Sequence, residues 1–445
     1  MITAASTVET RSLPRSRPAI VLLTIAVLTG AFYFIEHRNA EVSDLEAFTV
    51  TGDEMADKAA EGDIGRRVAF PAIGLFGALL LVRRDGWRLG LQSRLAWLLL
   101  GCLAWSMASV LWSVDPSLTV RRLSVLLLCT VGALGIARQV TLREVCWIAL
   151  AGTSLLVANS VRIEIALGTF LPFSADYRFA GTLHPNAQAP YCAMMALAAA
   201  FLASGARRGR VLLWALCLIG AVLLVLTKSR TVCASVVIGL LAYGLLTAPW
   251  TKRVMVGAAI LCAGCTLALA GSLLGWDIEG QAANVALIGR HEEADSLSGR
   301  VPLWAALVPY VQERLLLGHG YQTFWSPDRI DRFSQAFEWT VPDGHSAYLD
   351  TLLDLGAAGA LLGVLAVIAS VHGVARGYVA SGDLGCAFLF AMLTCRSLHA
   401  FLESALAVPT SFVPFILGCG VVHVAFCTDP SQPLSAKESA KELSR

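Results

Sequence analysis

The chain has 445 residues, of which 56% are hydrophobic and only 15% are charged, and its formal net charge is +2. Its mean hydropathy of +0.66 lies well above that of soluble globular proteins, which excludes that class, and the charge indicates no nucleic-acid partner. The twelve cysteines all fall in or at the ends of apolar segments, a distribution that does not predict a disulfide framework.

Apolar stretches of about twenty residues recur along most of the chain, and a helix of that length crosses a hydrocarbon core of about 30 Å. We therefore predict an all-α polytopic membrane protein with about 12 transmembrane helices and one structured loop on its outer side. The predicted spans cover residues 18–35, 68–82, 95–112, 123–138, 145–160, 186–204, 211–227, 232–248, 254–275, 346–371, 384–400 and 406–427.

The predicted organisation has five parts in chain order. They are an N-terminal span with an acidic insertion (1–67), membrane helices 2–9 (68–275), a large outer loop with an amphipathic helix (276–345), membrane helices 10–12 (346–427) and a cytoplasmic tail (428–445). The first apolar run resembles a signal peptide, but it is long and no small-residue cleavage site follows it, so we predict a span. The insertion at 36–67 holds nine acidic residues against four basic ones and shows no periodicity, which is typical of a solvated segment.

Basic residues in the short loops predict the orientation of the chain. Lys and Arg concentrate at 83–94, 137–144, 205–210, 249–255 and in the C-terminal tail. With twelve spans, all of these loops share one side with the N-terminus, and the positive-inside rule makes that side the cytoplasm. Both termini are therefore predicted to be cytoplasmic.

The outer loop at 276–345 carries a second kind of helical pattern. An apolar stripe of Trp304, Leu307, Val308, Val311 and Leu315 predicts an amphipathic helix along the membrane surface, within a structured cap. Pro309 is expected to kink this helix, and the glycines at 318 and 320 are expected to end it.

Several cations on the outer side are not explained by orientation. They are Arg121, Arg122, Arg178, Lys228 and Arg230. The planar fork of arginine matches phosphate oxygens, and a cluster beside apolar walls would hold a diphosphate, although each cation alone equally suits a carboxylate or a lipid headgroup.

Three other groups of polar residues are candidates for chemistry. In RFAGTLHPN (178–186), Pro185 suits the first position of a helix, so His184 is either a residue of that helix start or a ligand, and Asn186 either caps the backbone or binds sugar hydroxyls. His345 precedes a span and is either a helix cap or a base that accepts a proton from a hydroxyl. Arg396, His399 and Glu403 have the spacing of one helix face, which predicts a structural ion pair lining a cavity.

Taken in order, these stretches resemble the O-antigen ligase and O-antigen polymerase superfamily of bacterial envelope glycosyltransferases. The matching segments are WSVDPS (112–117), RFAGTLHPNAQA (178–189), the pair Ser229 and Arg230, SGRVPLWAALVPYVQERLLLGHGYQTF (298–324) and GHSAYLDTLLDLGAAG (344–359). The acidic insertion departs from a minimal family member, which leaves the topology of the first span open.

The resemblance implies a multi-pass protein of the bacterial inner membrane whose active site is periplasmic. It implies an inverting transferase without metal or cofactor that moves a glycan from undecaprenyl diphosphate to an acceptor glycolipid, such as lipid A core, or to a growing glycan. Matched residue by residue, the catalytic set is Arg230, Arg300 and His345, and only Arg300 comes from the resemblance alone. The predicted substrate-binding residues are Arg178, His184, Asn186, Lys228 and Tyr348.

Two alternatives stay open at this point. A ligase and an O-antigen or exopolysaccharide polymerase share donor, fold and motifs, and the single compact outer loop favours the ligase only weakly. A secondary transporter also has about 12 helices, but it usually shows two related halves with broken helices near the midplane, and no such correspondence is found here. A scaffold role leaves the outward arginines unexplained.

Overall fold

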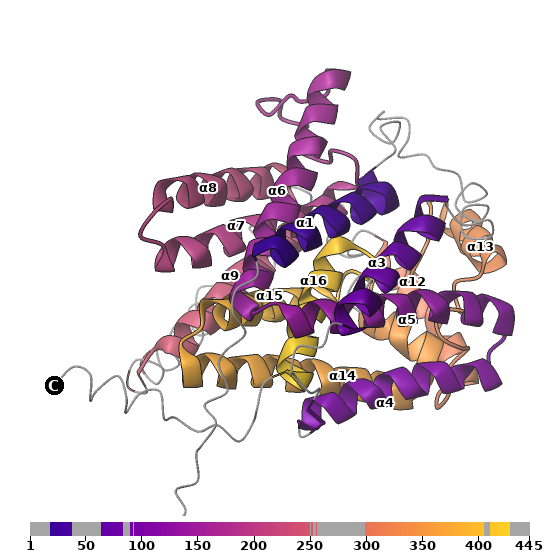
Figure 1. Ribbon diagram of the computed structural model, residues 1–445. Helices are drawn as coiled ribbons and strands as arrows, with labels where there is room; N and C mark the ends of the chain where they lie inside the picture. The colour runs from indigo at the N-terminus through magenta and orange to yellow at the C-terminus, as the bar shows by residue number, and fades with distance from the viewer. Residues whose placement is uncertain are drawn as a thin grey trace, which may run out of the picture.

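The computed structural model describes residues 18–37, 64–82, 90–91, 93–249, 251, 255, 299–404 and 410–427 (Figure 1). Within these ranges every regular element is a helix. The elements are α1 (Pro18–Phe32), the π-helical η1 (Tyr33–His37), α3 (Ile64–Val82), α4 (Arg94–Ala108), the 3-10 turn η4 (Ser109–Leu111), α5 (Pro116–Gln139), α6 (Leu142–Leu167), α7 (Pro185–Gly205), α8 (Arg210–Leu226), α9 (Arg230–Thr247), α12 (Arg300–Glu313), α13 (Pro327–Phe337), α14 (Ala347–Ser381), α15 (Leu384–His399) and α16 (Phe412–Phe426).

The helices confirm the prediction of an all-α polytopic membrane protein. Among the described residues, eight helical segments are long and apolar enough to cross a membrane, and α8, α15 and α16 are shorter apolar helices. Each predicted span except 254–275, of which the structure describes only residue 255, corresponds to one of these helices.

Local capping explains where the helices of the first half begin. Asp115 precedes Pro116 and accepts a hydrogen bond from the Leu118 amide at 2.9 Å, so α5 starts immediately after the turn at 112–115. Thr141 and Glu144 form a reciprocal capping box at the start of α6. The same helix ends at Gly168, whose φ of 70° is accessible to glycine at little cost.

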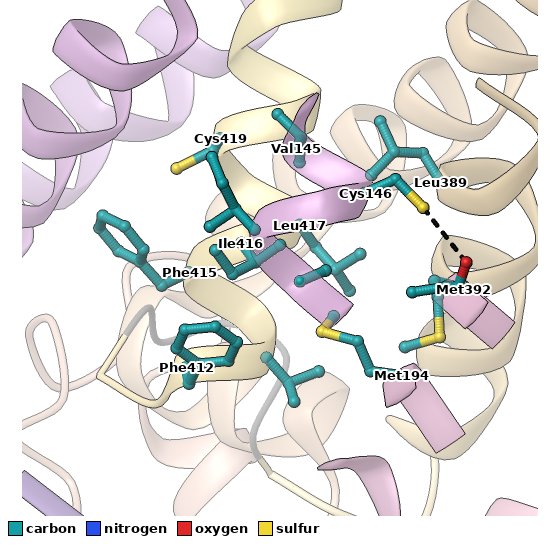
Figure 2. Packing of buried hydrophobic residues seen from close by; sticks show 14 of the residues in the cluster. Val145, Cys146, Met194, Leu389, Met392, Phe412, Phe415, Ile416, Leu417 and Cys419 are labelled. Atoms are coloured by element: carbon teal, nitrogen blue, oxygen red, sulfur yellow. Dashed lines mark hydrogen bonds between the residues drawn. The ribbon is translucent and has the colours of Figure 1, made fainter. Parts of the chain in front are cut away.

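The main core lies where α16 passes between α6, α7 and α15. Figure 2 shows Phe412, Ile416 and Leu417 of α16 among side chains of these three helices, including Val145 of α6 and Met194 of α7. All five of these side chains are buried. Large apolar side chains thus hold the last helix in the centre of the bundle.

Small residues hold α3 against α5. A Cβ atom added to Gly77 would lie 2.4 Å from the Cα atom of Gly132, and one added to Gly135 would lie 2.2 Å from the carbonyl oxygen of Gly77. Such close approach of two backbones is a common way for membrane helices to pack when apolar burial from water does not drive them together.

Helix α14 is broken at Gly356, where φ is 66° and ψ is −174°. The chain segment at 315–320 runs beside the break and pairs with its backbone. Ala357 donates its amide to the Leu315 carbonyl at 2.7 Å, and Gly320 donates to the Asp354 carbonyl at 2.8 Å. These bonds supply partners that the interrupted helix lacks, and they attach the outer loop to α14.

Helices α12 and α13 form a cap at one end of the bundle, on the right of Figure 1. Leu303 and Leu307 of α12 are fully buried in a cluster with Phe324 and Leu353. Of the predicted stripe, Leu307 lies in this core and Trp304 and Val311 pack against it, whereas Val308 and Leu315 are about half exposed. The predicted end of this helix near residues 318–320 is wrong, because α12 ends at Glu313 and the following residues pair with α14 instead.

The boundaries of the predicted acidic insertion also change. Its first two residues, Glu36 and His37, belong to η1, and its last four belong to α3, which begins at Ile64. The Glu36 carboxylate accepts a hydrogen bond from the Tyr191 hydroxyl, and His37 Nδ1 lies 2.5 Å from Thr182 Oγ1. The first span thus contacts α7 and the loop before it, while residues 38–63 lie outside the described part.

Candidate functional site

Arg178 connects the loop before α7 with the turn between α8 and α9. Its Nε donates to the carbonyl of Thr227 at 3.2 Å, and its Nη2 donates to Asn186 Oδ1 at 3.3 Å. The next residue, Phe179, is fully buried and donates its amide to the Leu226 carbonyl at 2.9 Å. Two segments that are about 50 residues apart in sequence are thus held together at the guanidinium of Arg178.

The turn between α8 and α9 carries two of the predicted cations. Lys228 has a positive φ of 52° and donates its Nζ to the carbonyl of Ala175. Arg230 is the first residue of α9 and is partly exposed. Because Arg178 bonds to Thr227 in the same turn, Arg178, Lys228 and Arg230 are carried by backbone segments that contact each other.

His184 is the N-cap of α7, with Pro185 in the first turn, so the helix-start interpretation of this residue is confirmed. Its Nδ1 accepts a hydrogen bond from the Asn186 amide at 3.3 Å. Burial and the positive charge of Arg178 lower the pKa of His184 below its ordinary value. His184 is therefore neutral at pH 7 and serves the helix end.

Glu403 joins residues from three separate elements. Its Oε1 lies 2.9 Å from Arg300 Nη2 at the start of α12 and 3.4 Å from Asn186 Nδ2 at the start of α7. Its Oε2 lies 4.0 Å from His345 Nδ1, two residues before α14. One partly buried carboxylate thus gathers a predicted arginine, a predicted amide and a predicted histidine.

The predicted shared face of Arg396, His399 and Glu403 is wrong for Glu403. Helix α15 ends at His399, so Glu403 lies in the irregular segment that follows and points to different partners. Within the helix, Arg396 Nη1 and His399 Nδ1 are 2.6 Å apart, and both side chains are buried.

His345 is held in an unusual backbone conformation. Its φ is 48°, in a backbone region that residues other than glycine rarely adopt. Its amide donates to Asp343 Oδ1 at 2.8 Å, and the neighbouring Gly344 accepts a hydrogen bond from Trp304 Nε1 at 2.8 Å. The ring of Trp339 stacks on the imidazole with centroids 5.3 Å apart. Backbone and ring contacts together therefore determine where the imidazole points.

Neighbouring charges shift the pKa values of His345 and Glu403 in opposite directions. Burial alone would lower the pKa of His345, but the carboxylates of Glu403 and Asp343 outweigh it and raise the pKa above 6.5. Burial would raise the pKa of Glu403, but His345 and Arg300 outweigh it and lower the pKa to about 2. Glu403 is consequently ionised at neutral pH and stabilises a proton on His345.

Tyr348 is the second residue of α14. Its hydroxyl donates to the Ser397 carbonyl of α15 at 3.0 Å, and its ring packs on Phe401 with centroids 4.6 Å apart. Tyr348 thus connects α14 with the end of α15, close to the segment that carries Glu403.

The structure brings most of the predicted residues together. Arg178, His184, Asn186, Arg300 and His345 lie in one network of contacts and charges around Glu403. Arg230 and Lys228 adjoin it through the turn that bonds to Arg178. The sequence interpretation missed the role of Glu403 as the common partner, although an acidic residue just after a predicted span, on the predicted side of several cations, is a pattern that indicates it.

Comparison with known proteins adds one result. A family model described as O-antigen ligase (Wzy_C) matches residues 215–364. The matched segment contains Arg230, Arg300, His345 and Tyr348, whereas Arg178, Asn186 and Glu403 lie outside it. No curated protein matches the chain.

Proposed function

We propose that this chain, whose residues 215–364 match the O-antigen ligase family, transfers a glycan from undecaprenyl diphosphate to an acceptor sugar. The reaction takes place at the periplasmic face of the bacterial inner membrane, and the acceptor is lipid A core or a similar glycolipid. The family match supports an enzyme of the ligase and polymerase class over a secondary transporter.

The observation that carries this proposal is the arrangement around Glu403. A diphosphate donor and a hydroxyl acceptor need a cationic group and a base within one site, facing the same reacting carbon. Arg300 and His345 both contact Glu403, at 2.9 Å and 4.0 Å, although 45 residues separate them in sequence. A base and a phosphate-binding cation are thereby close enough to act on one substrate.

The cations bind the donor diphosphate and stabilise the negative charge that develops on it. Arg178 and Arg230 approach from the side of α7 and α9, and Arg300 approaches from α12. The ion pair with Glu403 uses Nη2 of Arg300, and a guanidinium carries five N–H donors in a fixed fork. Arg300 is therefore able to contact Glu403 and a phosphate oxygen together.

The chemical step is a displacement at the anomeric carbon. The acceptor hydroxyl oxygen forms a bond to this carbon while the bond from the carbon to the phosphate oxygen breaks, which inverts the anomeric configuration. His345 accepts the hydroxyl proton, and undecaprenyl diphosphate leaves with the bonding electron pair. Glu403 and Asp343 stabilise the imidazolium that forms, as the raised pKa of His345 requires.

Replacing Glu403 by glutamine is expected to shift the pH dependence of transfer. His345 must be neutral to accept a proton, so wild-type kcat/KM falls as the pH decreases through its raised pKa. Without the negative charge of Glu403 this pKa is lower, so the acid limb moves to lower pH, while kcat falls because the imidazolium loses its partner. Glu338→Gln makes the same change at an exposed carboxylate in the loop that carries His345, and it serves as the control. An acid limb that stays in place in Glu403→Gln would contradict the role of His345 as the base.

Glycan analysis of a strain that lacks the protein tests the proposed function. Complete chains left on undecaprenyl diphosphate are expected if the protein is a ligase, because assembly continues and only the final transfer is lost. Single repeat units on the same lipid indicate a polymerase instead. Re-expression of the wild-type chain must restore the original pattern, and a lipid-linked pool that does not change on deletion would exclude both activities.

A further inference from the structure

Glu164 is a buried carboxylate near the end of α6, where its side chain belongs to a helix that crosses the membrane. Only 3% of this residue is exposed. A carboxylate at such a position is costly unless polar partners compensate for the water it loses. The partners of Glu164 therefore indicate what this residue does.

The three groups that donate hydrogen bonds to the Glu164 carboxylate all come from one turn, residues 177–181. Its Oε1 accepts the amides of Ala180 at 2.9 Å and Gly181 at 2.6 Å, and its Oε2 accepts the Tyr177 hydroxyl. Gly181 has a φ of 63°, and a Cβ atom there would lie 2.2 Å from Ser160 Cβ. The turn is thus held tightly against α6 by Glu164 and by the close approach at Gly181.

This turn carries Arg178 and supports the turn that leads to Arg230. Arg178 donates its Nε to the Thr227 carbonyl, and Phe179 donates its amide to the Leu226 carbonyl. A displacement of residues 177–181 would therefore move the guanidinium of Arg178 directly and loosen the α8–α9 turn before Arg230.

We infer that Glu164 is a positioning residue for the diphosphate-binding cations Arg178 and Arg230, an inference that rests on the proposed function. Its carboxylate does not bind the donor. It fixes the backbone from which Arg178 projects and against which the segment before Arg230 is packed. The donor diphosphate thus meets preorganised cations, and less of the binding free energy is spent on ordering them.

Direct binding of two lipids tests this inference with purified full-length protein in detergent. Undecaprenyl diphosphate reports on the cations, and undecaprenol, which has the same tail without phosphate, reports on the apolar contacts alone. Glu164→Ala is expected to weaken the binding of undecaprenyl diphosphate by about tenfold in Kd, as for the loss of one hydrogen bond to a charged group. Its Kd for undecaprenol is expected to stay at the wild-type value.

Two further variants separate positioning from general stability. Glu164→Gln keeps an oxygen that accepts the amides of Ala180 and Gly181, so it is expected to restore most of the diphosphate affinity. Glu144→Ala removes a carboxylate that accepts a backbone amide at the other end of α6, in the capping box with Thr141. It matches the local change in Glu164→Ala and is expected to leave both Kd values unchanged.

The outcomes distinguish the inference from the proposed function. Wild-type affinity for undecaprenyl diphosphate in Glu164→Ala, or an equal loss for both lipids, would overturn the inference while the function stands. If the wild type binds both lipids equally and Arg230→Ala has no effect, the proposed function itself fails. Should Glu164→Ala not accumulate, Glu164→Asp, whose shorter side chain does not reach both amides, takes its place with the same expected results.

Discussion

Glycan transfer is expected to fall by about 10²–10⁴-fold in kcat when His345 is replaced by alanine, the range for loss of a general base. His345 is the predicted base, and its imidazole is held by Trp339 and by its own strained backbone. Glutamine at this position keeps a polar side chain of similar reach but accepts no proton, so His345→Gln should be as inactive as the alanine variant.

A histidine far from the site provides the control for this result. His372 is exposed in the second half of α14, beyond the break at Gly356. His372→Ala is expected to transfer glycan at the wild-type rate and to accumulate to the same level. If His345→Gln retains wild-type kcat at equal protein level, proton transfer through this imidazole is not part of the reaction.

The second large effect is expected at Arg300. Arg300→Ala should lower kcat/KM by about 10²–10³-fold, as for removal of one donor that stabilises charge on a leaving group. Arg300→Lys restores a charge but not the planar fork, and a single ammonium cannot serve Glu403 and a phosphate oxygen in the same geometry. We therefore expect partial activity in the lysine variant.

The same change also affects the pair next to it. Arg300 contributes to the low pKa of Glu403, so Arg300→Ala leaves that carboxylate with His345 as its main partner. Arg332→Ala, an exposed arginine in α13 of the same cap, controls for a general loss of positive charge. Equal activity of Arg300→Ala and Arg332→Ala would show that charge at residue 300 has no specific role in transfer.

The helices could be predicted from the sequence because a membrane span needs only a long apolar run, a property of composition. The errors lie where polar side chains extend or end these runs. The span predicted to end at 160 continues as α6 to Leu167, because the carboxylate of Glu164 is compensated by the turn at 177–181. No apolar pattern within the span contains that information.

The candidate site could be predicted in part for a different reason. Arg178 and Arg230 stand out because cations are unexpected on the outer side, and His345 because it ends a long loop. Glu403 was assigned to a helix face by its spacing from Arg396, but α15 ends four residues earlier. Its contacts with Arg300 and Asn186 depend on how three distant elements pack, which spacing along one helix does not describe.

The break in α14 has a consequence for the size of the substrate. The 35 residues of this helix would extend about 50 Å if unbroken, and the part after Gly356, about 37 Å, is by itself long enough for the hydrocarbon layer. With the part after Gly356 spanning the layer, the part before the break would add roughly 13 Å of helix between the layer and His345 on the proposed periplasmic side. A saccharide of any length would then be joined in water at the proposed site, while only the isoprenoid of the donor stays in lipid.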